Sequence, residues 1–279
     1  MVENRPVLQW LTHLVLVIGV IIVAFPVYLA IIATTHTTET LAVSAPLLPG
    51  GELWRNLSTV WNFDPPGMPP FWLMVWNSTV MTLIIMVGKI VISILSAYAV
   101  VYFKFPGRQL AFWLIFITLM LPVEVRILPT YEVVASLKML NSYAGLTIPL
   151  IASATATFLF RQFFMTVPDE LMEAARVDGA GALKFFWDIL LPLSRTNIAA
   201  LAIILFVYGW VQYLWPLLVT TREEHFTLMM GIKQMAGSLE VDPQWNIIMT
   251  AVVLAMLPPV LIVILMQRLF VKGLIDTEK

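Results

Sequence analysis

Cysteine, histidine and charge are all scarce in this sequence. None of the 279 residues is cysteine, which excludes a disulfide framework, a cysteine-ligated metal site and a thiol nucleophile. The three histidines, His13, His36 and His225, lie in different segments, so no metal site is expected. Only 12% of the residues are charged, against about 25% in soluble domains. Such a chain does not have the polar surface of a water-soluble globule.

Hydrophobic residues make up 60% of the chain and the mean hydropathy is +0.89, so the sequence predicts an all-α integral membrane protein. A helix needs about 20 apolar residues to cross a bilayer. Six runs of about that length are candidate transmembrane helices: 8–33, 75–101, 110–128, 143–160, 198–219 and 245–266. The first is longer than the apolar core of a secretory signal, about 7–15 residues, which favours an uncleaved span. We expect residues 1–279 to form a single transmembrane domain.

The basic residues predict the orientation of these spans, because Lys and Arg accumulate on the cytoplasmic side of a membrane. Ten lie at the two chain ends or in the second and fourth loops: Arg5, Lys104, Arg108, Arg161, Arg176, Lys184, Arg195, Arg268, Lys272 and Lys279. Five lie in the other three loops: Arg55, Arg126, Lys138, Arg222 and Lys233. This bias places both termini in the cytoplasm. The loop 34–74 is then external, and its many prolines and glycines predict a structured loop without long helices.

A polar segment, residues 161–196, separates the fourth and fifth apolar runs. Thr166 and Asp169 resemble a helix-capping pair, and Pro168 fits in a first helical turn. Gly179 predicts the end of this helix, because glycine accepts the positive φ of the residue after a helix. A second helix is expected over about 180–191, with an apolar face made of Phe185, Phe186, Ile189 and Leu190. By its residues alone, this pair could lie on the lipid surface or bind a partner protein.

The polar segment contains the pattern E-A-A-x3-G-x9-I-x-L-P, from Glu173 to Pro192. It resembles the cytoplasmic loop by which permease subunits of binding-protein-dependent ABC importers bind their ATPase, and the wider resemblance runs from the second span to the end of the chain. In that family the loop enters a groove of the ATPase and transmits its closure. The resemblance assigns ATPase coupling to Glu173, Ala174, Ala175, Asp178 and Gly179.

Three segments indicate which members of this family the chain resembles most specifically: 120–126, 141–147 and 152–164. They are similar to the permeases that serve sn-glycerol-3-phosphate importers, which implies this substrate or glycerophosphodiesters. A neutral sugar or an oligosaccharide is the alternative. At Val211 the family usually has Asn, which puts in doubt any polar role of that position.

The resemblance implies a complex in the bacterial inner membrane. Its other members are a homologous permease subunit, two ATPase subunits and a periplasmic substrate-binding protein, with membrane lipid around them and no nucleic acid. The chain has no G-x-x-x-x-G-K-[ST] phosphate loop, since Gly88-Lys89 lacks both the earlier Gly and the following Ser or Thr. ATP and magnesium are therefore expected on the partner ATPase, with no cofactor and no enzymatic activity on this chain.

Polar groups inside the predicted spans are candidates for a substrate path, because charge is costly to bury in a membrane. Lys89 lies near the middle of the second span, on one helix face with Thr82, Ser93 and Ser96. The full candidate set is Lys89, Ser93, Glu124, Arg126, Tyr208 and Gln212. Cations suit a phosphate-bearing substrate, but Lys89 could equally be a structural residue paired with a carboxylate. Glu124 and Arg126 could gate the outer mouth, and the fifth-span face that carries Tyr208 and Gln212 is also typical of packing.

By position between the last two spans, the resemblance assigns a receptor-contacting loop to Gly231, Ile232, Lys233, Gln234 and Gly237. Two other classes of membrane protein are less well supported by the sequence. A secondary transporter or channel would need coupling-ion carboxylates in midspan, and a membrane enzyme would need a cluster of acids, bases or metal ligands. Neither pattern is evident, which favours the importer permease.

Overall fold

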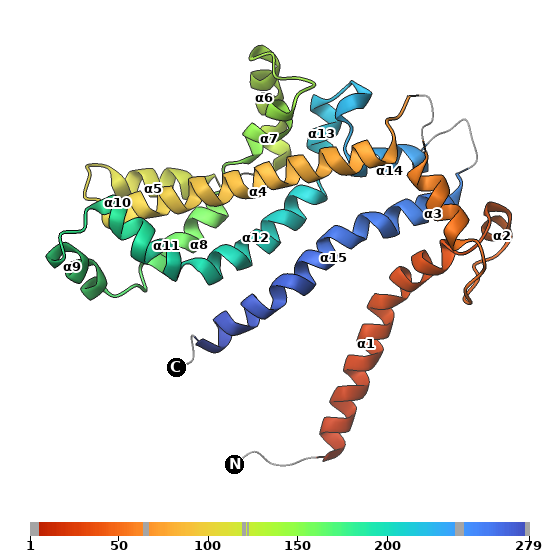
Figure 1. Cartoon of the computed structure of the whole chain (residues 1–279), viewed down its shortest axis with the longest axis horizontal. Helices are drawn as coiled ribbons and strands as arrows, with labels where there is room; N and C mark the ends of the chain where they lie inside the picture. Colours follow the sequence, from red (N-terminus) through yellow and green to blue (C-terminus); the bar gives the residue numbers. More distant parts are fainter. Residues whose placement is uncertain (1–5, 64–66, 119–120, 122, 238–242, 277–279) are drawn as a thin grey trace. The chain divides into compact units, whose positions relative to one another are not determined.

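The computed structural model describes residues 6–63, 67–118, 121, 123–237 and 243–276, without the side chains of 6–9, 123–124 and 267–276. Throughout these ranges the chain forms helices and no strand, which confirms the all-α fold (Figure 1). The helices are α1 (Pro6–Ala33), α2 (Thr38–Val43), α3 (Leu53–Trp61), α4 (Phe71–Tyr102), α5 (Arg108–Ile117), α6 (Val123–Ser136), α7 (Tyr143–Thr147), η1 (Ile148–Leu150), α8 (Ala154–Phe164), α9 (Asp169–Val177), α10 (Ala182–Phe185), η2 (Phe186–Leu190), α11 (Leu191–Leu193), α12 (Arg195–Trp210), α13 (Leu214–Val219), η3 (Glu223–His225), α14 (Leu228–Gly237) and α15 (Trp245–Asp276).

Three helices, α1, α4 and α15, are long and apolar enough to cross a membrane by themselves. Two further spans arise if bent pairs are counted. Residues Tyr143–Leu150 meet α8 at 45°, and residues Ala182–Leu193 meet α12 at 70°. The described residues thus contain three to five spans, and the expected six stay a prediction.

The third apolar run, 110–128, is not the single helix that the sequence predicts. Helix α5 ends at Ile117 and α6 begins at Val123. Pro122 lies in the sequence between them, and a proline removes one backbone N–H donor and so favours a kink or a break in a helix. Glu124 and Arg126 therefore do not lie at the end of one continuous span.

The fifth apolar run, 198–219, is also divided. Helix α12 ends at Trp210 and α13 begins at Leu214. Pro216 has no N–H to donate to Gln212, so one helical hydrogen bond is missing where the two helices meet. Tyr208 lies in α12 and Gln212 lies between the two helices, so the prediction that one helix face carries both is wrong.

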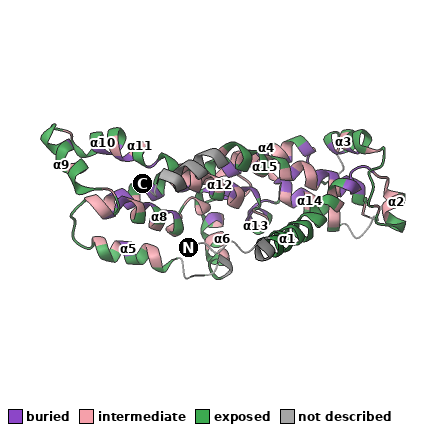
Figure 2. Cartoon of the chain, turned by 90° about the horizontal axis from the view of Figure 1, so that it is seen from below, coloured by how far each residue is buried: buried purple, intermediate pink, exposed green. Residues whose placement is uncertain are grey.

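Two compact units make up the chain, and the single-domain organisation stays a prediction. The first unit holds α1, α2, α3 and residues 231–257. In the described residues between α1 and the start of α4 at Phe71, the helices are the short α2 and α3, in agreement with the expected absence of long ones. Asn246 Nδ2 donates to Asn56 Oδ1 at 2.9 Å, and Asn56 Nδ2 donates to the carbonyls of Thr34 and His36. This network, in which both asparagines are buried, ties the loop to the first turn of α15. By contrast, α1 is exposed along nearly its whole length (Figure 2).

The second unit runs through most of α4 to Met230 and includes residues 258–276. Its helices α9, α10 and α11 gather at the C-terminal end of α4 (Figure 1). One apolar cluster joins α4, α8, α12 and these short helices. A second joins α4, α6, α7 and α13, with Trp215 and Leu146 buried in it. These two clusters pack against different parts of α4, the second around Met81 and Ile85 and the first around Ile94 and Tyr98, with Lys89 between them in the sequence.

Candidate functional site: coupling helices and transport path

The first helix of the polar segment, α9, begins without the predicted side-chain cap. Pro168 occupies the N-cap position, and the Thr166 hydroxyl donates to the Phe163 carbonyl at 2.7 Å. The capping pair of Thr166 and Asp169 and the place of Pro168 inside the first turn are therefore wrong. Asp169 and Glu170 nevertheless lie in the first turn, where their charges interact favourably with the helix dipole.

Gly179 ends α9 as predicted, because its φ of +74° is a conformation that side chains with a Cβ rarely adopt. Its N–H donates to the Arg176 carbonyl at 3.0 Å, and the N–H of Ala180 donates to the Ala175 carbonyl at 2.8 Å. These two bonds form the Schellman motif and satisfy carbonyls at the helix end. The turn between the two helices is thus fixed by backbone bonds.

The second helix is continuous from Ala182 to Leu193 but contains a π turn, η2. The N–H of Leu191 donates to the Phe186 carbonyl, five residues back. Pro192 gives a physical reason, because it cannot donate to Asp188 and its ring would clash with that carbonyl in an α-helix. The widened turn avoids this clash.

The inner faces of the two helices are packed against the protein itself. Phe185, Phe186 and Leu190 are at most 5% exposed, and they pack with α4 and α8 in the first apolar cluster. Ala175 of α9, also 5% exposed, belongs to the same cluster. Because Ala175 is small, α9 lies close to the protein's own core at this position. The predicted apolar face of the second helix is buried in the same cluster and is therefore not available to lipid.

The outer face of the pair is exposed. Four of the five predicted coupling residues lie there: Glu173, Ala174, Asp178 and Gly179. Large apolar side chains accompany them, with Val177 87% exposed and Leu183 74% exposed. Exposed apolar side chains next to charged ones are typical of a protein-binding surface. We call the exposed residues 173–174 and 177–179, which lie in α9 and the turn after it, the coupling surface.

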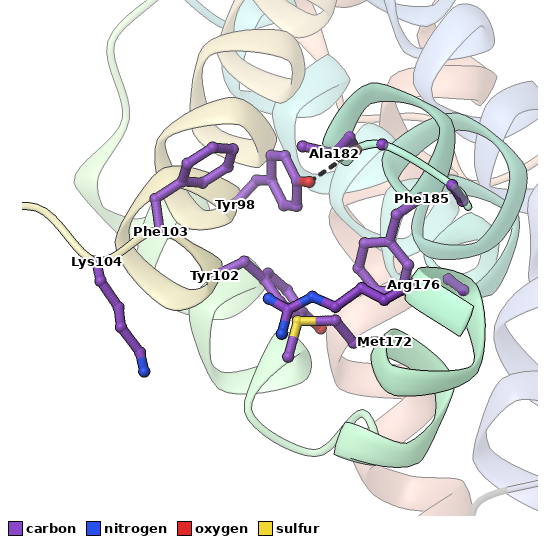
Figure 3. A pocket seen from close by; sticks show the side chains of 11 residues that line it. Tyr98, Tyr102, Phe103, Lys104, Met172, Arg176, Ala182 and Phe185 are labelled. Atoms are coloured by element: carbon purple, nitrogen blue, oxygen red, sulfur yellow. Dashed lines mark hydrogen bonds between the residues drawn. The ribbon is translucent and has the colours of Figure 1, made fainter. Parts of the chain in front are cut away.

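A cavity of about 360 Å³ lies between this helix pair and the end of α4 (Figure 3). Tyr98, Tyr102 and Lys104 line it from the α4 side, and Met172 and Arg176 line it from α9. In Figure 3 the Arg176 side chain extends across the cavity toward Tyr102, while Lys104 points away from it.

Lys89, the predicted central cation, is buried on α4 with 6% exposure. Its Nζ lies 3.8 Å from the centroid of the Tyr208 ring, a cation–π contact between α4 and α12. Arg126 lies close enough for its charge to act on both groups, although its own side chain is exposed. Among the described side chains no carboxylate lies within 4.0 Å of Lys89; that of Glu124 is outside the described set. The structure therefore places the Lys89 ammonium over the Tyr208 ring, within range of the charge of Arg126.

The other polar groups considered for the substrate path are mainly engaged with backbone. Ser93 Oγ donates to the Ser153 carbonyl at 3.2 Å, and Gln212 Nε2 donates to the Tyr208 carbonyl at 3.1 Å. Thr82 is fully buried, and in the described part of the chain its hydroxyl has no hydrogen-bond partner. A Cβ added at Gly209 would lie 3.1 Å from the Thr82 Cα, so α4 and α12 cross closely beside Tyr208. This close crossing holds the aromatic ring over Lys89.

The residues assigned to a receptor loop form a helix instead. Gly231, Ile232, Lys233, Gln234 and Gly237 all belong to α14, and residues 238–242 lie outside the described set. The segment is helical because no proline interrupts Leu228–Gly237 and most of its residues favour helix, and its contact with the receptor stays a prediction. Lys233 and Gln234 are exposed, whereas Gly231 is buried.

Two asparagines that were not predicted as functional residues form hydrogen bonds with the segment 221–226, which precedes α14. Asn77 is fully buried, and its Nδ2 donates to the carbonyls of Glu224 and Phe226, both at 2.9 Å. Asn141 Oδ1 accepts the N–H groups of Thr221 and Arg222. A lone asparagine at the edge of an apolar run is a weak signal, since its partners are about 80 to 150 residues away in the sequence.

Comparison with known proteins matches this chain to a family of membrane transport components. The model of the family "Binding-protein-dependent transport system inner membrane component" matches residues 89–276. The sn-glycerol-3-phosphate transport system permease protein UgpE of Yersinia enterocolitica is 57% identical over 281 residues, covering 100% of both chains. The protein of the same name from Pectobacterium atrosepticum is also 57% identical with the same coverage. A solved bacterial ABC transporter that imports the acidic polysaccharide alginate matches 96% of this chain and 98% of its own, with a TM-score of 0.84 and 18% identity. That last similarity shows a shared fold.

Proposed function

Because the chain belongs to the family of binding-protein-dependent transport system inner membrane components, we propose that it is the permease subunit of an ATP-driven importer of sn-glycerol-3-phosphate or glycerophosphodiesters. The observation that carries this proposal is the 57% identity, over the whole chain, with permeases named for sn-glycerol-3-phosphate transport. A buried cation, Lys89, with Arg126 near it supports an anionic substrate.

As a multi-pass membrane protein of this family, the chain works as one component of a larger transport system. The complex consists of this subunit, a homologous permease subunit, two ATPase subunits and a periplasmic substrate-binding protein in the bacterial inner membrane. ATP and magnesium bind to the ATPase subunits, and this chain binds no cofactor. The bias of basic residues supports cytoplasmic termini and a cytoplasmic position for α9 and α10.

In the proposed cycle, the coupling surface docks into the ATPase. A short helix with small and charged exposed residues, Ala174, Glu173 and Asp178, suits a groove on the partner. The inner face of the same helix pair packs on α4, so closure of the ATPase dimer is passed to the helix that carries Lys89. Exposed residues of α14, Lys233 and Gln234, are the candidate contacts with the substrate-binding protein.

Reconstitution of the complete complex in proteoliposomes tests this function. We expect uptake of labelled sn-glycerol-3-phosphate that requires ATP and the substrate-binding protein, and that an excess of glycerophosphodiester reduces. Uptake of a neutral sugar or oligosaccharide instead of the phosphate would contradict the substrate. Absence of ATP-dependent uptake of any of these compounds from an intact complex would contradict the permease role itself.

A further inference from the structure

Tyr98 makes a directional contact between the long helix α4 and the second coupling helix. Its side chain is 7% exposed, and its hydroxyl donates to the carbonyl of Ala182 at 2.8 Å (Figure 3). Ala182 is the first residue of α10, directly after the turn that follows the coupling surface. The bond thus joins α4 to the point where the second coupling helix begins.

Aromatic rings surround this bond but do not replace it. The Tyr98 ring lies 5.1 Å from that of Phe186, and the Tyr102 ring lies 5.4 Å from that of Phe185, centroid to centroid. Ring contacts tolerate sliding, because the attraction changes little with small displacements, whereas a hydrogen bond weakens steeply when its angle changes. The cavity beside Tyr98 leaves space on one side of the rings. The hydrogen bond is therefore the contact that fixes the position of α10 along α4.

We propose that Tyr98 is a positioning residue that transmits movement of the coupling helices to α4. Tyr98 and Lys89 are nine residues apart on one uninterrupted helix, roughly 14 Å along its axis. A displacement of α10 is passed through the Tyr98 hydroxyl to α4 and so to the buried cation. This inference rests on the proposed importer function and assigns a contact within it.

Tyr98→Phe removes the hydroxyl and keeps the ring. The Ala182 carbonyl still accepts the N–H of Phe186, so no carbonyl is left without a donor and the helix pair is expected to fold. Tyr102→Phe is the matched control. It deletes the same atom four residues away in the same cluster, but that hydroxyl donates to the Phe164 carbonyl of α8 at 3.4 Å, so this variant leaves the hydrogen bond to Ala182 in place.

The measurement is the number of sn-glycerol-3-phosphate molecules transported per ATP hydrolysed by the reconstituted complex. We expect Tyr98→Phe to keep receptor-stimulated hydrolysis and to lower this ratio by about threefold or more, an effect of the size of one hydrogen bond. Tyr102→Phe should leave the ratio unchanged.

An unchanged ratio in Tyr98→Phe, or an equal fall in both variants, would overturn the proposal. Loss of complex assembly in Tyr98→Phe would also overturn it, because the bond would then be a structural tie. Failure of the importer function is distinguishable, since the unmodified complex would then show no ATP-dependent transport at all.

Discussion

Gly179 and Gly181 stand two residues apart in the turn between the coupling helices, yet their backbones differ. Gly179 has a φ of +74°, whereas Gly181 has a φ of −73°. A Cβ added to either glycine would meet nothing within 4 Å, so only the backbone conformation separates them. A residue with a Cβ in the left-handed region costs about 1–2 kcal/mol.

We therefore predict that Gly179→Val weakens coupling and that Gly181→Val does so much less. A penalty of about 1–2 kcal/mol is a shift of about 5- to 30-fold in the population with the native turn. Receptor-stimulated ATP hydrolysis and co-purification of the ATPase should fall in that range for Gly179→Val. Equal activities of the two variants would show that the positive φ is not required.

Lys89 has two possible roles, recognition of a charged substrate and stabilisation of the fold, and one substitution can separate them. Lys89→Met keeps the length of the stem and removes the charge that faces Tyr208. We predict that sn-glycerol-3-phosphate transport falls more than about tenfold, equivalent to about 1.4 kcal/mol, while assembly and basal ATP hydrolysis persist.

Lys104→Met is the control for Lys89, because it makes the same change at an exposed position beyond the end of α4. Transport by this variant should stay near that of the unmodified complex. Loss of assembly in Lys89→Met would identify a structural lysine. Normal transport by an assembled Lys89→Met complex would remove Lys89 from the path.

At the scale of the element, α9 presents two neighbouring alanines to different surroundings. Ala175 is 5% exposed in the first apolar cluster, whereas Ala174 is exposed on the coupling surface. We predict that Ala175→Leu destabilises the chain by about 1–3 kcal/mol through overpacking. Ala174→Leu should leave thermal stability unchanged and weaken association with the ATPase. Thermal unfolding and ATPase pull-down of both variants are the measurements, and the reverse pattern would show that the two faces are assigned wrongly.

Elements whose ends depend on local chemistry could be predicted from the sequence. The end of α9 follows from the backbone freedom of Gly179, and α1, α4 and α15 follow from apolar length. The start of α9 was predicted incorrectly, because Thr166 could bond either forward or backward and donates to Phe163. Hydropathy does not mark the gap between α12 and α13, since the residues on both sides are apolar, whereas Pro216 is a local signal for an irregularity there.

Contacts over long sequence distances account for what the sequence could not predict about the site. The polarity of Lys89 marked it as a candidate, and its ring partner Tyr208 was a separate candidate on another span. Their meeting depends on the close crossing of Gly209 and Thr82, which no local pattern encodes. The partners of Asn77 escaped prediction for the same reason.

At the scale of the whole molecule, the orientation in the membrane is open to a direct test, since the chain contains no cysteine. Two exposed acidic residues on opposite predicted sides accept a single cysteine each: Glu223 in η3 and Glu170 in α9. The ten-to-five bias of basic residues predicts that the first lies outside and the second in the cytoplasm. In intact spheroplasts a membrane-impermeant maleimide should therefore label Glu223→Cys and leave Glu170→Cys unlabelled, and inverted vesicles should give the opposite result. Labelling of both variants from one side would mean that the number of spans between α9 and η3 is even, which would also exclude the six-span topology.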